Sequence, residues 1–206
     1  DPYRATACDR QETLTLTANA STPPHTGLTR SSVHRDHALI TPESHVPIHL
    51  PGWDNTEAIV LISQEMGAKF GQMLVHCHAN ARITTLAAKD EWFILVLSGS
   101  IEAHFDGGAH PVAQDEYGYL PPNMDWHITS ANGAELMVFR KPYIALPGQE
   151  PPGPMRRALK DIPAEPFLGD EGSLLQTLLP DDPAHDWGIN LFEFVPGGTL
   201  PNVENH

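Results

Sequence analysis

Short apolar runs separated by turn signals dominate residues 34–142, and this pattern limits the fold more than any other feature of the sequence. The apolar runs are residues 58–62, 73–75, 92–97 and 136–139, and the turn signals include Pro51-Gly52, Asp106-Gly107-Gly108 and Asn132-Gly133. Residues 101–106 alternate between apolar and polar side chains, as a strand with one buried face does. Short strands that recur between turns are typical of a β-sandwich or a barrel. We therefore predict one all-β unit over residues 34–142.

The composition agrees with this prediction and excludes several classes of protein. Twenty Pro and 16 Gly among 206 residues leave little room for long helices, while 40% hydrophobic residues can fill a core. The formal net charge of −14 argues against nucleic acid or an anionic membrane as a partner. No apolar stretch approaches the roughly 18 residues of a membrane-spanning helix. Cys8 and Cys77 form neither a disulfide framework nor a cysteine-based zinc pattern, so we expect a reduced, cytoplasmic protein.

Changes of composition divide the chain into four parts. Residues 1–33, rich in Thr, Ser, Ala and Pro, are predicted to form an N-terminal arm. Residues 143–166 are Pro-rich and are interpreted as a linker, in which residues 155–162 could form one or two helical turns. Residues 167–206 begin a second β-unit, with strands expected at 173–179 and 186–195. A second barrel needs about 100 residues, so we expect this unit to be truncated in the chain.

The histidines of the first unit do not follow the usual metal-site spacing of a β-barrel. His76 and His78 share one face of a strand, but the next acidic residue, Asp90, lies too far along the chain. His127 comes one residue later than is usual after the turn at 119–123, and one residue turns a side chain to the opposite face of a strand. We therefore expect the first unit to be metal-free, with these histidines packed or exposed at the barrel mouth.

The strongest candidate for a metal site lies at the end of the sequence. Glu204 and His206 stand two residues apart after a Pro-Gly-Gly turn, on a strand expected to face the interior of a barrel. A carboxylate and a neutral imidazole on one face can begin a site for a hard or borderline divalent ion. The alternative is that these polar residues are simply solvated at the chain end.

Several segments resemble the (S)-ureidoglycine aminohydrolase family, formerly grouped as allantoin-catabolism proteins. They are residues 35–46, 50–53, 119–123, 178–180 and 194–198, followed by Glu204-Asn205-His206. The resemblance implies a bicupin, that is, two double-stranded β-helix barrels, of which the first is metal-free. It also implies a manganese ion in the second barrel, held by a Glu-x-His-x-x-x-His pattern and a later Gln. Glu204 and His206 match the first two of these ligands, and the other two are expected beyond residue 206.

The resemblance implies manganese-dependent hydrolysis of (S)-ureidoglycine, a small-molecule substrate, to (S)-ureidoglycolate and ammonia in purine and allantoin breakdown. It further implies a homo-oligomer, and we expect the 206-residue chain alone to be inactive. The main alternative is a non-catalytic cupin that binds a small carboxylated or sugar-like ligand. A metal-dependent oxidase or decarboxylase is less favoured, because Glu204 stands where a first His is typical of those relatives. A structural role in an assembly is a further possibility. The residues that contact substrate, and a general base, are not identified by the sequence.

Overall fold

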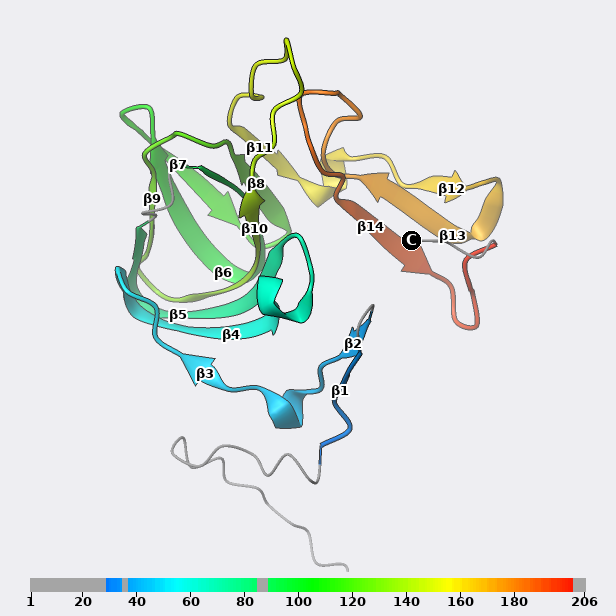
Figure 1. Ribbon diagram of the computed structural model, residues 1–206, viewed down its shortest axis with the longest axis horizontal. Helices are drawn as coiled ribbons and strands as arrows, with labels where there is room; N and C mark the ends of the chain where they lie inside the picture. The colour runs from blue at the N-terminus through cyan, green and yellow to red at the C-terminus, as the bar shows by residue number, and fades with distance from the viewer. Residues whose placement is uncertain (1–28, 35–36, 85–88, 202–206) are drawn as a thin grey trace, which may run out of the picture.

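The computed structural model describes residues 29–34, 37–84 and 89–201, and almost all of its regular structure is β-strand (Figure 1). Its helical elements are short 3-10 turns at Pro42–Ser44, Gln64–Met66 and Leu159–Asp161. The strands are β1 (Ser32–Val33), β2 (Ala38–Leu39), β3 (Pro47–Ile48), β4 (Trp53–Ile62), β5 (Gly71–Thr84), β6 (Asp90–Phe105), β7 (Gly108–Ala113), β8 (Glu116–Leu120), β9 (His127–Ser130), β10 (Ala134–Pro142), β11 (Met155–Ala158), β12 (Glu165–Phe167), β13 (Asp170–Thr177) and β14 (Asn190–Phe194). The predicted all-β class is confirmed.

Nine strands form one antiparallel sheet that closes on itself, and we call it the barrel. Its main order is β11-β8-β6-β10-β5-β4-β3, with β7 paired to β6 and β9 paired to both β5 and β6. Closure depends on the length of β5 and β6, which have 14 and 16 residues. β5 pairs with β10 along residues 71–77 and with β9 along residues 81–84. β6 pairs with the same two strands, so β5, β10, β6 and β9 complete a ring.

The interior of the barrel is filled by apolar side chains. Along β5, Met73, Val75 and Cys77 point inward, as the two-residue period of a strand requires. Trp92 packs edge-on against Trp126, with 5.3 Å between the ring centroids. The interior of the barrel is therefore a hydrophobic core, and the polar side chains of β5 point outward.

The barrel contains a close approach between Gly99 in β6 and Gly133 in the turn before β10. Gly99 and Gly133 both have a positive φ, of 75° and 96°. A Cβ added at Gly99 would lie only 2.4 Å from the carbonyl oxygen of Gly133. Glycine at position 99 is thus required both by backbone conformation and by space.

A separate three-stranded antiparallel sheet, in the order β12-β13-β14, lies beside the barrel, and we call it the second unit (Figure 1). A buried cluster joins it to the barrel, and we call this contact the junction. The barrel strands contribute buried aromatic side chains, and the segments that flank β12 and β13 contribute buried aliphatic side chains. The buried members are Phe93, Tyr117, Tyr119, Ile162, Leu178 and Leu179. β13 and β14 lie in the region in which strands were expected. β13 begins a few residues before the expected strand 173–179, and β14 is shorter than the expected strand 186–195.

The segment predicted as a linker contributes to the barrel sheet. Residues 155–158 form β11, which pairs with β8, and only Leu159–Asp161 is helical, as a 3-10 turn. The helical turns expected from residue 155 are therefore wrong for β11. Pairing with β8 explains the difference, because residues 155–158 bond to residues 116–119 as an antiparallel strand. The proposed domain boundaries and the bicupin organisation remain predictions.

Candidate functional site

The predicted metal ligands Glu204 and His206 lie outside the described residues. The turn that leads to them is described, and the amide of Gly198 donates to the carbonyl of Val195 at 2.7 Å. Gly197 has a φ of 83°, as a tight turn of this kind allows. The metal site at Glu204 and His206 therefore stays a prediction.

His76 and His78 lie on the outer face of the barrel, on either side of the inward-facing Cys77. Each imidazole lies beside a glutamate carboxylate on a neighbouring strand. His76 Nδ1 lies 3.2 Å from Glu135 Oε1, and His78 Nε2 lies 3.9 Å from Glu57 Oε1. Within residues 29–34, 37–84 and 89–201, no three His, Cys, Asp or Glu side chains are placed to hold a metal ion.

His127 also faces outward, and it lies opposite His104 on β6. The two imidazole rings stack with their centroids 4.3 Å apart. His104 Nε2 forms a hydrogen bond of 3.2 Å with Thr129 Oγ1. Desolvation, with Arg82 and His104 nearby, lowers the pKa of His127. The rings are parallel to within 4°, so their nitrogens do not converge on one point between them.

Three charged side chains are brought together where the barrel meets the second unit, and we call them the charged cluster: Glu91, Lys141 and Asp186. Glu91 on β6 is 0% exposed and Lys141, its neighbour on β10, is 8% exposed. Lys141 Nζ donates to Glu91 Oε1 at 3.2 Å and also contacts Asp186 Oδ2. The hydroxyl of Tyr119 donates to the other Glu91 oxygen at 2.8 Å. The amide of Ile144 donates to Asp186 Oδ2 at 2.7 Å.

The environment of the charged cluster shifts the acidity of its members. Burial raises the pKa of Glu91 to about 7, and the neighbouring Asp186 adds to this rise, against the opposing effects of Tyr119 and Lys141. Burial also acts to raise the pKa of Asp186, but its bonds within the cluster and to the Ile144 amide outweigh burial and leave it lowered. Burial raises the pKa of Tyr119, and its bond to Glu91 adds to the rise. Glu91 is therefore the member that can carry a proton near neutral pH.

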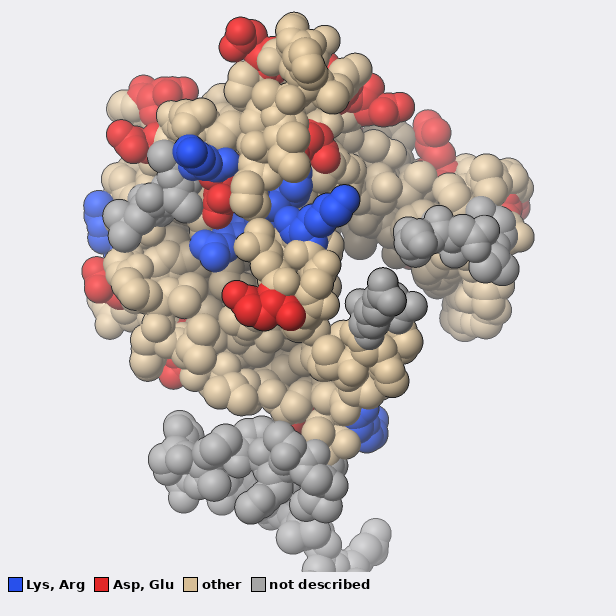
Figure 2. All heavy atoms as spheres, viewed as in Figure 1, with Lys and Arg blue, Asp and Glu red and all other residues tan. Residues whose placement is uncertain are grey.

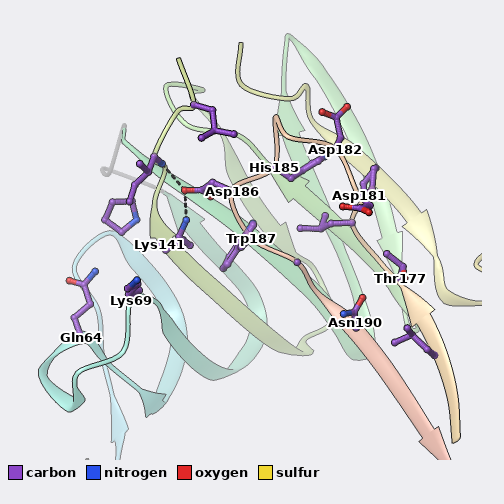
Figure 3. Close-up of a pocket in the computed structure, with 17 residues that line it drawn as sticks. Gln64, Lys69, Lys141, Thr177, Asp181, Asp182, His185, Asp186, Trp187 and Asn190 are labelled. Carbon is purple, nitrogen blue, oxygen red and sulfur yellow. Dashed lines mark hydrogen bonds and ion pairs between the residues drawn. The ribbon is translucent and has the colours of Figure 1, made fainter. Parts of the chain in front are cut away.

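Lys141 and Asp186 of the charged cluster line a cavity of about 1010 Å³ between the barrel and the second unit. In Figure 3, Asp186 and Lys141 point toward each other, while Gln64 and Lys69 lie on the barrel side of the cavity. Thr177 and Asn190 line it from β13 and β14. Figure 2 shows the hollow between the barrel and the second unit. Basic side chains gather near the middle of this face of the molecule, and many acidic side chains lie along its upper edge.

The sequence does not single out the charged cluster, because Glu91, Lys141 and Asp186 belong to no motif. The one available signal was Tyr119, which falls in a segment shared with the ureidoglycine aminohydrolases. Its hydroxyl meets Glu91 only because β8 and β6 pair.

The closed antiparallel barrel, completed by the long strands β5 and β6, places the chain in the cupin class of folds. Among solved structures, protein Ylba from E. coli aligns with a TM-score of 0.75 and 24% identity, over 87% of this chain and 73% of that one. A protein from Pseudomonas aeruginosa described as glyoxylate induced aligns with a TM-score of 0.69 and 23% identity, over 78% and 63%. These two likenesses concern the fold.

Sequence comparison relates the chain to the (S)-ureidoglycine aminohydrolases, as its motifs predicted. It is 36% identical to "Probable (S)-ureidoglycine aminohydrolase" of Oryza sativa subsp. japonica, over 87% of this chain and 58% of the relative. It is 32% identical to the enzyme of that name from Arabidopsis thaliana, over 87% and 60%, and 26% identical to that of Escherichia coli K12, over 84% and 67%. The chain thus spans about three-fifths of the two plant relatives. No family model matches it.

Within the described residues, no helix has the length and apolar character needed to cross a membrane.

Proposed function

We propose that the whole protein hydrolyses (S)-ureidoglycine to (S)-ureidoglycolate and ammonia, as a step of purine and allantoin breakdown, at a manganese site in a second cupin barrel. The observation that carries this proposal is the 36% identity, over 87% of the chain, to a relative named for that activity. Because the chain spans 58% of that relative, the proposal concerns the whole protein. Assembly into a cytoplasmic homo-oligomer is part of the same proposal.

The two-residue period of a strand supports the pairing of the metal ligands. Met73 and Val75 stand two residues apart on β5, and both face the barrel core. Glu204 and His206 have the same separation and would share one face of a strand, where the first barrel carries apolar side chains instead.

The donor set of Glu204 and His206 fits manganese, which accepts carboxylate oxygen and imidazole nitrogen. Bound manganese would supply a Lewis acid that can hold the carboxylate and amine of the substrate and stabilise developing charge. Glu204 would bind as a carboxylate and His206 as a neutral imidazole. Metal affinity is therefore expected to fall as the pH drops below about 6.5, where a free imidazole takes up a proton.

The test combines ammonia release from (S)-ureidoglycine with the manganese bound per chain, both measured on the whole protein. Glu204→Gln and His206→Ala are each expected to lower manganese affinity by about tenfold or more, and activity with it. His78→Ala is the matched control, because His78 stands two residues after His76, as His206 does after Glu204, but faces outward. Equal loss in the control, or full activity without manganese, would contradict the proposal.

A non-catalytic cupin that binds a small ligand is the second candidate, favoured by the cavity of about 1010 Å³ beside the barrel. The two candidates differ in metal content. About one manganese per chain together with ammonia release supports the enzyme. A protein that binds a small carboxylated ligand, but holds no manganese and releases no ammonia, supports the alternative.

A further inference from the structure

The charged cluster connects parts of the chain that are far apart in the sequence. Glu91 and Lys141 belong to neighbouring barrel strands, while Asp186 belongs to the segment that leads into β14. Tyr143 makes a second link to the same segment, because its hydroxyl donates to the carbonyl of Ala184 at 2.9 Å. The charged cluster thus lies among polar contacts between the barrel side and this segment, with Glu91 as its buried member.

The charges at this point do not balance. Two carboxylates flank one ammonium group, so the charged cluster carries a net charge of −1 when both acids are ionised and no net charge when one proton is bound. An unbalanced charge in a buried site is costly, whereas a neutral, hydrogen-bonded set is not. Glu91 is fully buried and the Asp186 side chain is 11% exposed, so water screens this charge poorly.

We propose that Glu91, Lys141 and Asp186 form a proton-dependent lock that holds the segment before β14 against the barrel. The lock is firm when one proton is shared within the cluster and loosens when that proton leaves. The contact that responds is the junction, because Leu178 and Leu179 are buried there only while this segment stays in place. The lock is independent of the proposed hydrolysis.

The other titratable groups around Glu91 define the sign of the effect. Tyr119 donates to it, and Tyr143 lies close enough to share its environment. Asp90 pairs with Arg140 at 3.9 Å on the neighbouring position of the same two strands. His185 packs edge-on against Tyr119, and burial lowers its pKa. His185 therefore opposes Glu91, because it favours the docked state as the pH rises.

For Glu91, the docked pKa of about 7 lies above the ordinary value of 4.5. The docked state then binds more protons than the open state between these limits, so docking weakens as the pH rises from about 5 to 7 and levels off near pH 8. One linked proton changes the opening equilibrium by up to about tenfold per pH unit.

The experiment measures residue-resolved amide hydrogen exchange at Ile144 from pH 5 to 8. The Ile144 amide donates to Asp186 across the contact between the barrel side and the segment, so its exchange reports opening of the segment. The protein and its Glu91→Gln variant are compared at each pH. Their ratio cancels the intrinsic exchange rate and the opposing effect of His185.

We expect the opening constant of the native protein, relative to Glu91→Gln, to rise about fortyfold between pH 5 and 7 and to level off near pH 8. Glu135→Gln, which alters a half-exposed carboxylate on the outer face, should show a constant ratio. A ratio for Glu91→Gln that stays within about twofold across this range overturns the lock.

A measurement on the unaltered protein covers the case in which Glu91→Gln fails to fold. Glutamate labelled with ¹³C at the side-chain carboxyl should show one resonance that titrates near pH 7. If every glutamate titrates below about pH 5.5, the cluster binds no proton near neutrality and the proposal is refuted.

Discussion

Removing one buried hydroxyl group should reveal how strongly the junction ties the second unit to the barrel. Tyr117 is 0% exposed, and its hydroxyl donates to the carbonyl of Leu178 at 2.5 Å. In Tyr117→Phe the ring keeps its stacking on Phe93, at 5.0 Å between centroids, so the change leaves packing almost untouched. The carbonyl of Leu178, in a residue 3% exposed, loses its donor. A buried acceptor left without a partner costs about 1–3 kcal/mol.

Urea unfolding followed by tryptophan fluorescence measures this loss, and thermal unfolding should show a Tm lower by about 2–4 °C for each kcal/mol. Tyr143→Phe is the graded control, because its hydroxyl bonds the Ala184 carbonyl in a half-buried position and should cost less. A loss in Tyr117→Phe below about 0.5 kcal/mol, the size typical of surface changes, would show that the junction is not closed in solution.

Two further predictions concern the barrel. Gly99→Ala should lower stability by clearly more than Gly107→Ala in the same urea assay, because both have φ near 75° but only Gly99 would bring a Cβ against backbone. The control should cost about 1–2 kcal/mol, and equal losses would show that the approach to Gly133 is not tight. Burial raises the pKa of Cys77 to about 11, so in a Cys8→Ser background the Cys77 thiol should react with a thiol reagent at pH 8 only as fast as the barrel opens. Rapid reaction of the folded protein would contradict this burial.

The β-class of this protein is predictable because strand periodicity is local. Ile101 and Ala103 are buried while Glu102 is exposed, as their alternation indicates. The turn signal at Asn132-Gly133 likewise falls between β9 and β10. The same reasoning was less successful for residues 155–162, where the four residues of β11 do not alternate between buried and exposed positions. Pairing with β8 decides that segment, and no local pattern carries that information.

The charged cluster could not be predicted for a related reason. Glu91 follows Asp90 at the start of an apolar run, and in a sequence such a pair of acids indicates a solvated strand end. Its partner Lys141 is 50 residues away and Asp186 lies in another unit of the fold. Whether a carboxylate is buried depends on what covers the strand, which only the tertiary structure determines.

The face that a strand turns toward a barrel interior can carry either packing or chemistry. On β5, Met73 and Val75 stand two residues apart on that face and add only hydrophobic packing. Placing Glu204 and His206 at the same spacing would convert that packing into a metal-binding face, at the cost of burying a charge that needs a cation. The identity of those two residues, and not the path of the strand, would then separate a structural barrel from a catalytic one. Under the proposed function, the activity of the whole protein should therefore depend on residues 204 and 206, while the first barrel contributes a hydrophobic core and the buried junction.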